Sequence, residues 1–425
     1  MSRSVYMPLP LPQMRLVRQQ YQIPPAVDIA LSVEREWQRL DKEAVLRPGM
    51  RIAVGVGSRG ISNLATVVRE VVGRLRAYGC RPFVTPAMGS HGGATARGQI
   101  DVLAARGITE QSVGAVVEAT MDVVPMGEQD GIPLFMDRLA HEADGIVVIN
   151  RIKPHTNFIG PTESGIIKIT AIGLGNQTGA EYYHRLAMAR DYYEIISTAG
   201  IELIKRCKVL FGVGLVENQE HQTCELRIIP AGDIAVVETE MLKKARQCLP
   251  LLPMDEIDLL IVNEMGKDIS GEGIDPNVVG RDVCACGARR NLPHISRIVV
   301  LDLTDGSAGS ALGVGQADFT VRRLVDKIDF ETTAVNCITS CCPESGMVPL
   351  TLPNDRQAIA TALKTVRPYS LGDLRIVQIK NTLDLSCMLV SIGCLSDLEK
   401  RNDVMVEPDD LELQFNESGD LISRI

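Results

Sequence analysis

The chain has 425 residues, of which 45% are hydrophobic and 23% charged, and its formal net charge is −9. This length exceeds what one hydrophobic core usually supports, so two domains are expected in an ordinary globular protein. The acidic balance argues against nucleic acid as a partner. No apolar run approaches the roughly 20 residues of a membrane-spanning helix, and residues 1–25 lack the apolar region of a secretory signal, so no membrane association is expected.

The eleven cysteines are an odd number and are scattered along the chain. That pattern disfavours a secreted disulfide framework and predicts reduced thiols in a cytoplasmic protein. Cys284 with Cys286, and the adjacent Cys341 and Cys342, lack the C-x2-C spacing of a zinc site. A structural or incidental role is expected for both pairs.

The first half of the chain alternates between strand and helix patterns. Strands are predicted for 51–57, 81–87, 145–150, 209–216 and 226–229. Helices are predicted from Ser62, as N-cap, to Gly79, over 134–143, and over a long stretch at 180–205. Short strands that alternate with helices are typical of parallel βαβ units, so the expected fold class is α/β, with two domains of mostly parallel sheets flanked by helices.

A domain boundary is predicted near Pro250–Pro253. The chain then divides into an N-terminal catalytic and cofactor-binding domain, 1–253, and a C-terminal α/β domain, 254–425. A new strand begins at 258–263, and the alternation resumes over 298–303, 319–327, 356–366 and 374–380. The last stretch, 411–425, is expected as a strand that returns to the first domain.

Three loops that follow predicted strands are rich in glycine and polar residues. They contain Ser58 and Arg59, the segment GSHGGAT (89–95), and the segment RIKPHTNF (151–158). Ligands of α/β sheets bind where loops leave the carboxyl ends of the strands, so these loops are the candidate site. Glycines such as Gly89 and Gly92 allow the backbone to approach a ligand closely, although they also fit a simple tight turn.

Only six histidines occur in the chain, and three of them fall in or near this region. His91 and His155 lie in strand-exit loops, and His184 lies in the predicted long helix. Imidazole exchanges a proton near neutral pH and also binds nickel or zinc. A single histidine is more often a surface or core residue, but two in separate strand-exit loops favour a shared site.

Lys168 interrupts the apolar run GIIKITAIGLG (165–175). One interpretation is an alternating strand in which Lys168 faces water. The other is a desolvated lysine, whose lowered pKa would make it a nucleophile. The glycines of the run do not have the spacing of a dinucleotide-binding loop.

With these segments in view, the chain resembles the nickel-dependent lactate racemase family over roughly 7–329. The likeness is carried by KPHTNFIGPTESGIIKITAIGLGNQTGAEYYH (153–184), by GSHGGAT (89–95) and by SALGVGQADFTVRRLVDKID (310–329). The prolines of the N-terminal arm also look like that family.

The resemblance implies a role for each matched residue. His91 and His155 would be catalytic bases on opposite faces of the substrate, and Arg59 would hold the substrate. Lys168 would tether a nickel-pincer nucleotide, a pyridinium-3,5-bisthiocarboxylic acid mononucleotide. His184 would be the protein ligand to nickel in a square-planar site. Ser58, Gly89 and Gly92 are further candidates for cofactor binding.

Two departures from the family pattern concern the substrate. The acidic residue that relatives often carry three positions before the arginine is Val56 here. The family's second-domain loop has a Gln and a Lys that face the substrate; the comparable stretch here is 266–281, in which Lys267, Asn277 and Arg281 are the substrate-loop candidates. A loop this polar suggests a 2-hydroxyacid that is larger or more polar than lactate.

The resemblance therefore implies an isomerase, a racemase or epimerase that inverts C2 of an α-hydroxyacid by hydride transfer. Its expected partners are the small-molecule substrate and the enzymes that make the cofactor. Two alternatives stay open from the residues themselves. One is a zinc hydrolase or lyase built on His91, His155 and His184, and the other is a non-catalytic carrier of the nickel-pincer cofactor.

Overall fold

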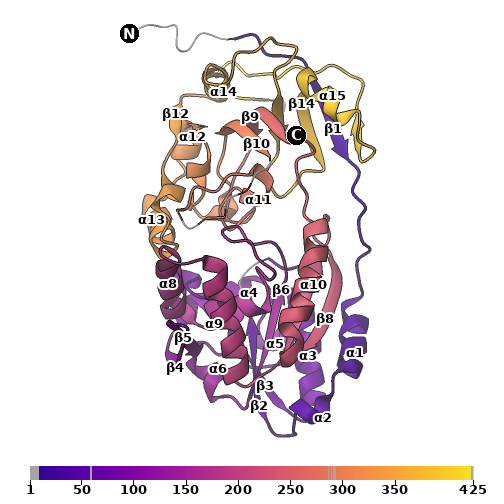
Figure 1. The fold of residues 1–425 in the computed structure, drawn as a ribbon, viewed down its shortest axis with the longest axis vertical. Coiled ribbons are helices and arrows are strands. Elements are labelled where there is room, and N and C mark those ends of the chain that lie inside the picture. The colour runs from indigo at the N-terminus through magenta and orange to yellow at the C-terminus, as the bar shows by residue number, and fades with distance from the viewer. Residues whose placement is uncertain (1–8, 58–59, 286, 289, 291–292, 423–424) are drawn as a thin grey trace. The chain divides into compact units, whose positions relative to one another are not determined.

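The computed structural model describes residues 9–57, 60–285, 287–288, 290, 293–422 and 425, and the chain divides into two compact units. One unit is 23–249. The other combines 1–22 with 250–425. Both are layered α/β structures, as the sequence predicts, and the elements of each are labelled in Figure 1.

The 23–249 unit is built on a five-stranded sheet with the order β3-β2-β6-β7-β8. Strands β3, β2, β6 and β7 pair in parallel, and β8 is antiparallel to β7. The strands are β2 (Arg51–Val56), β3 (Arg81–Pro86), β6 (Gly145–Arg151), β7 (Val209–Glu217) and β8 (Thr223–Pro230), and a separate hairpin joins β4 (Val123–Gln129) to β5 (Ile132–Asp137).

The longer helices of this unit each bury an apolar stripe in its core. In α3, for example, every buried position is valine or leucine. The helices are α1 (Ile29–Arg39), α2 (Lys42–Val45), α3 (Leu64–Ala77), α4 (Ala96–Ala105), α5 (Glu110–Val113), α6 (Arg138–Glu142), α7 (Ile166–Lys168), α8 (Asn176–Ala187), α9 (Tyr192–Arg206) and α10 (Ile234–Gln247), with short helical turns η2 (Gly92–Ala94), η3 (Ile169–Gly173) and η4 (Ala231–Asp233).

The second unit contains an eight-stranded mixed sheet with the order β12-β11-β10-β9-β13-β14-β1-β15. Its strands are β1 (Met14–Gln19), β9 (Glu256–Val262), β10 (His294–Val300), β11 (Phe319–Val321), β12 (Leu350–Leu352), β13 (Ile376–Ile379), β14 (Cys387–Ser391) and β15 (Val404–Val406). Strands β9 to β13 pair in parallel, and the central β9 and β13 are buried along nearly their whole length, which is the pattern of strands covered on both faces.

The helices of this unit are short. They are α11 (Pro276–Val279), α12 (Arg322–Val325), α13 (Phe330–Thr339), α14 (Asp355–Leu363) and α15 (Leu395–Leu398), with turns η5 (Asp305–Ser307), η6 (Val314–Gln316), η7 (Pro343–Gly346) and η8 (Ile392–Cys394). No helix in the described part of the chain is both long and apolar enough to cross a membrane.

The predicted division of the chain needs a correction at both ends. Strand β1 pairs with β14 and β15, so the N-terminal arm belongs to the unit built by 250–425 (Figure 1). The C-terminal stretch stays in that same unit, where Leu411 bridges Met14 and Leu421 bridges Phe415. The exchange thus runs opposite to the prediction, because β1 lies between β14 and β15 in the C-terminal sheet and buries Met14 and Val17 there.

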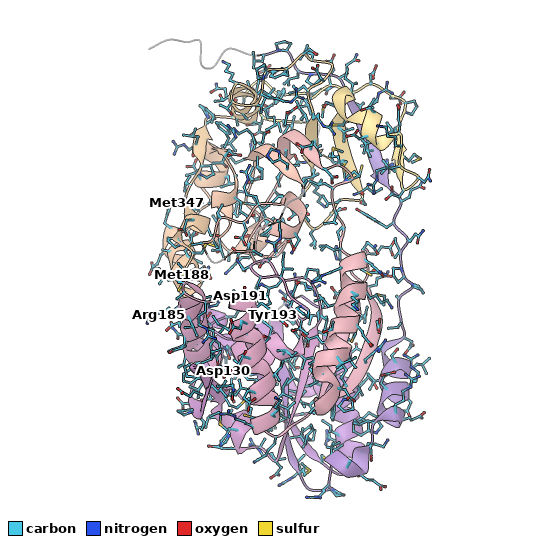
Figure 2. All side chains as sticks on the ribbon, viewed as in Figure 1. Asp130, Arg185, Met188, Asp191, Tyr193 and Met347 are labelled. Carbon is cyan, nitrogen blue, oxygen red and sulfur yellow. A yellow bond between two sulfur atoms is a disulfide. The ribbon has the colours of Figure 1, made fainter. Side chains whose placement is uncertain are left out.

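Three predicted elements of the 23–249 unit also change. The helix predicted over 134–143 is the end of β5 followed by α6. The N-cap of α3 is Asn63 instead of Ser62. The long helix predicted over 180–205 is two helices, α8 and α9, because Asp191 caps a new helix by accepting a hydrogen bond from the backbone N–H of Glu194. Figure 2 labels Met188 and Asp191 in this turn.

The cysteine prediction is wrong for one pair. Cys284 and Cys342 form a disulfide bond, whereas seven other described cysteines are free thiols, most of them buried: Cys80, Cys207, Cys224, Cys248, Cys337, Cys387 and Cys394. Cys341 is half-buried, and Cys286 lies outside the described residues. The bond joins the segment after α11 to the turn after α13, two segments whose proximity no spacing in the sequence reveals.

Candidate functional site

The candidate site of the 23–249 unit gathers around the carboxyl ends of β2, β3 and β6. Gly57 directly follows β2, and a Cβ atom there would lie 2.8 Å from Ile169 Cδ1 and 3.0 Å from Asn150 Oδ1. The end of β2 therefore abuts both η3 and the end of β6. Ser58 and Arg59, which follow, lie outside the described residues.

The loop after β3 carries His91 and is tied to η3. The backbone N–H of Gly89 donates to the carbonyl of Gly173 over 3.1 Å, and Gln99 Nε2 donates to the carbonyl of Gly89 over 2.8 Å. Gly89 and Gly92 have φ values of +61° and +67°, which L side chains rarely adopt. These glycines fold the loop back on itself and place half-buried His91 at the start of η2.

Lys168 lies in a helix and not in a strand. It ends α7, and the chain continues directly into η3, a π-helical turn with five buried residues. The strand interpretation of this run is therefore wrong. Lys168 is half-buried while the neighbours on either side of it are buried. Single π-helical turns occur frequently at functional sites.

A buried carboxylate that the sequence analysis did not single out caps the N-terminus of α7. Glu238 of α10 is 0% exposed, and one of its oxygens accepts hydrogen bonds from the backbone N–H groups of Ile166 (2.8 Å) and Ile167 (3.1 Å). Burial raises the pKa of Glu238 to about 7, although the two N–H donors act in the opposite direction. Any side chain at Gly165 would collide with this carboxylate. The available signal was an acid on the apolar stripe of 234–247, a helix that the sequence analysis did not predict.

His184 lies on α8 and interacts electrostatically with Lys168. Burial, and secondarily the positive charge of Lys168, lower the pKa of His184 to about 4, while the carbonyl of Ala180 one turn earlier acts in the opposite direction. Its Nδ1 atom is buried and has no hydrogen bond of acceptable geometry among the described residues. The ring is consequently neutral at pH 7, which is the form of imidazole that binds a metal.

His155 lies in the loop after β6 and connects to His184 through Tyr192. The His155 ring stacks on Phe158 with centroids 4.1 Å apart and meets Tyr192 edge-on at 6.2 Å. Tyr192 in turn lies 5.5 Å from the His184 ring. Tyr192, at the start of α9, was not predicted, because the break that begins this helix was itself not predicted.

The three substrate-loop candidates lie in the other unit and have structural contacts there. Arg281 donates to Asp318 and to the carbonyls of Gln316 and Ile295, so it fastens its segment to the sheet. Asn277 donates to Asp275, the N-cap of α11, and Lys267 Nζ donates to Asn336 over 2.6 Å.

The zinc alternative is not supported by the arrangement of side chains. Within the described ranges, no three histidine, cysteine, aspartate or glutamate side chains are grouped closely enough to hold a metal ion. His91, His155 and His184 all lie within those ranges, so they do not form the three-histidine set that such a site requires.

No protein-family model matches the chain, and a search of curated proteins gives no match. Among solved structures, the chain is similar to the lactate racemase apoprotein from Thermoanaerobacterium thermosaccharolyticum, with 13% sequence identity and a TM-score of 0.49. The match covers 86% of this chain and 84% of that chain. A likeness at this level assigns no activity, so the function is argued from the residues of the site.

Proposed function

We propose that the protein is a racemase or epimerase that inverts C2 of an α-hydroxyacid and uses a nickel-pincer nucleotide bound at Lys168 and His184. The supporting observation is the pairing of these two residues on one interrupted helix, with His184 neutral at pH 7. The local sequence from Lys153 to His184, which resembles nickel-dependent lactate racemases, adds to this support.

The residues present fit such a cofactor. A lysine whose charge acts on a buried imidazole is suited to covalent attachment of a ligand near a metal-binding nitrogen. Gly89 brings the loop of His91 against the π-helical turn, where its backbone N–H donates to the carbonyl of Gly173. When bound, the cofactor would supply a hydride acceptor for the α-hydrogen of the substrate.

The protein's own part of the chemistry is proton transfer and binding. We assign His91 and His155 to the hydroxyl proton, which must leave as the α-hydroxyacid becomes a 2-keto acid and return as the hydroxyl re-forms. General acid–base groups of this kind contribute roughly 10²- to 10⁴-fold each. Arg59 is the candidate for the substrate carboxylate, because a guanidinium binds carboxylates with two parallel hydrogen bonds.

The proposed partners are a small 2-hydroxyacid and the enzymes that make the cofactor. Lys267, Asn277 and Arg281 remain the proposed substrate-loop residues.

The first test is an intact mass spectrum with metal analysis on protein made together with the cofactor-synthesis enzymes. We expect a mass adduct that carries nickel in the wild type and no adduct in Lys168→Ala. Lys168→Arg keeps the positive charge but lacks the amine, so it should lose the adduct too. Lys205→Ala, at an exposed lysine of α9, is the matched control and should keep it.

The outcomes separate the remaining functions. An adduct together with inversion of a panel of 2-hydroxyacids supports the proposal. An adduct with no turnover of any hydroxyacid would favour the cofactor carrier. An unmodified mass, with neither nickel nor a pyridinium chromophore, would overturn the cofactor assignment.

A further inference from the structure

The loop that carries His155 is organised around one buried carboxylate. Where the two ends of the loop meet, Lys153 and Ser164 exchange backbone hydrogen bonds of 2.9 and 3.1 Å. Inside it, Glu163 is 2% exposed and accepts hydrogen bonds from the backbone N–H groups of His155 (2.6 Å) and Gly160 (3.2 Å). The carboxylate thus bridges the two sides of the loop.

Arg246 of α10 holds this carboxylate in place. Its Nη2 atom donates to Glu163 over 2.5 Å and to the carbonyl of Gly160 over 2.9 Å. Because Glu163 is buried, removing its partner would leave a desolvated charge without its ion pair. Arg246 is 43% exposed, so its replacement disturbs the loop more than the core.

The same loop determines which nitrogen of His155 accepts a hydrogen bond. The backbone N–H of Asn157 donates to His155 Nδ1 over 3.0 Å. A ring nitrogen that accepts a hydrogen bond carries no proton, so the proton of the neutral imidazole is on Nε2. Stacking on Phe158, with the rings inclined by 20°, keeps the ring plane in this orientation.

We propose that Glu163 and Arg246 are positioning residues for His155, and that they hold its loop so that the resting ring presents Nε2–H. The catalytic meaning of this arrangement rests on the proposed function. His155 then enters the reaction as a hydrogen-bond donor to a substrate oxygen. To take the hydroxyl proton at Nε2, the ring must first release its Nε2 proton to solvent and bind one at Nδ1, which requires that the hydrogen bond from the N–H of Asn157 be broken.

The arrangement can be tested without any cofactor. Full-length protein made without the cofactor-synthesis enzymes is labelled with ¹⁵N-histidine, and His155→Gln identifies the ring signals of His155. In the wild type at neutral pH we expect Nδ1 to resonate as an unprotonated nitrogen and Nε2 to carry the proton. A wild-type ring with its proton on Nδ1 would overturn the proposal.

Variants then test the positioning residues. In Arg246→Ala and in Glu163→Gln we expect a mixture of the two ring tautomers and at least tenfold faster deuterium exchange of the amides of 155–160. Arg246→Lys should restore much of the wild-type behaviour. Lys243→Ala, an exposed position of the same helix, is the control. Wild-type tautomer and exchange rates in both Arg246→Ala and Glu163→Gln would refute the assignment.

Kinetic measurements on protein that carries the cofactor distinguish this inference from the proposed function. If both hold, Arg246→Ala lowers kcat at least tenfold while KM changes less than threefold, since a misplaced ring affects the reaction more than binding. If the NMR and exchange results hold but the wild type inverts no hydroxyacid, the proposed function fails and the structural assignment of the loop stands.

Discussion

Glu238 makes the stability of the 23–249 unit depend on pH, and Glu238→Gln measures by how much. The pKa of this carboxyl is raised from 4.5 to about 7, mainly by burial. An acid with a raised pKa binds its proton more tightly in the folded state than in the unfolded chain. The folded unit is therefore favoured below about pH 4.5, and this advantage is lost as the pH rises through about 7.

The size of the effect follows from the two pKa values. Their difference, 7 − 4.5 = 2.5, corresponds to about 3 kcal/mol at about 1.36 kcal/mol per pH unit. Solvent screening does not reduce this figure, because Glu238 is 0% exposed. Glutamine has no proton to lose. The unfolding free energy of the wild type relative to Glu238→Gln should consequently fall by about 3 kcal/mol between pH 4.5 and pH 8.

The single tryptophan provides the assay. Trp37 lies in the core of the 23–249 unit, where its ring packs against Phe211 at 6.2 Å, so urea titrations followed by its fluorescence report on that unit. Glu240→Gln removes an exposed carboxylate from the same helix and should change stability by less than about 0.5 kcal/mol at every pH. Parallel stability curves for the wild type and Glu238→Gln would refute the reasoning.

Three further predictions concern the loops and the metal ligand. Gly92→Ala should destabilise the protein by more than about 2 kcal/mol in the same urea assay, because its Cβ would lie 2.5 Å from backbone carbon; Gly93→Ala, also at positive φ but with no atom within 4 Å, should cost about 1 kcal/mol. Reduction of the Cys284–Cys342 bond, which spans 58 residues, should lower the melting temperature of the unit outside 23–249 while Trp37 fluorescence is unchanged, and an unaltered calorimetric trace would contradict this. His184→Ala should keep the mass adduct at Lys168 but lose nickel in metal analysis; full retention of nickel would remove His184 from the ligand set.

Local patterns in the sequence were enough to predict the fold class and the strand-exit loops. Runs such as LLIV in β9 and IVVI in β6 contain only residues that suit a strand buried on both faces. Parallel strands bring their carboxyl ends to one edge, so the loops of His91 and His155 were expected on the same side of the sheet. The pairing of Lys168 with His184 was implied only by the resemblance to a known family.

Tertiary contacts decided the features that have no local signal. The N-terminal strand joins the C-terminal sheet because β14 offers it an open edge, and the disulfide joins segments 58 residues apart. Glu238, Glu163 and Arg246 are ordinary charged residues in the sequence, and their importance depends on which backbone N–H groups they meet after folding. A buried charge is stable only where partners from other segments satisfy it, and those partners are brought together by the packing of the whole unit.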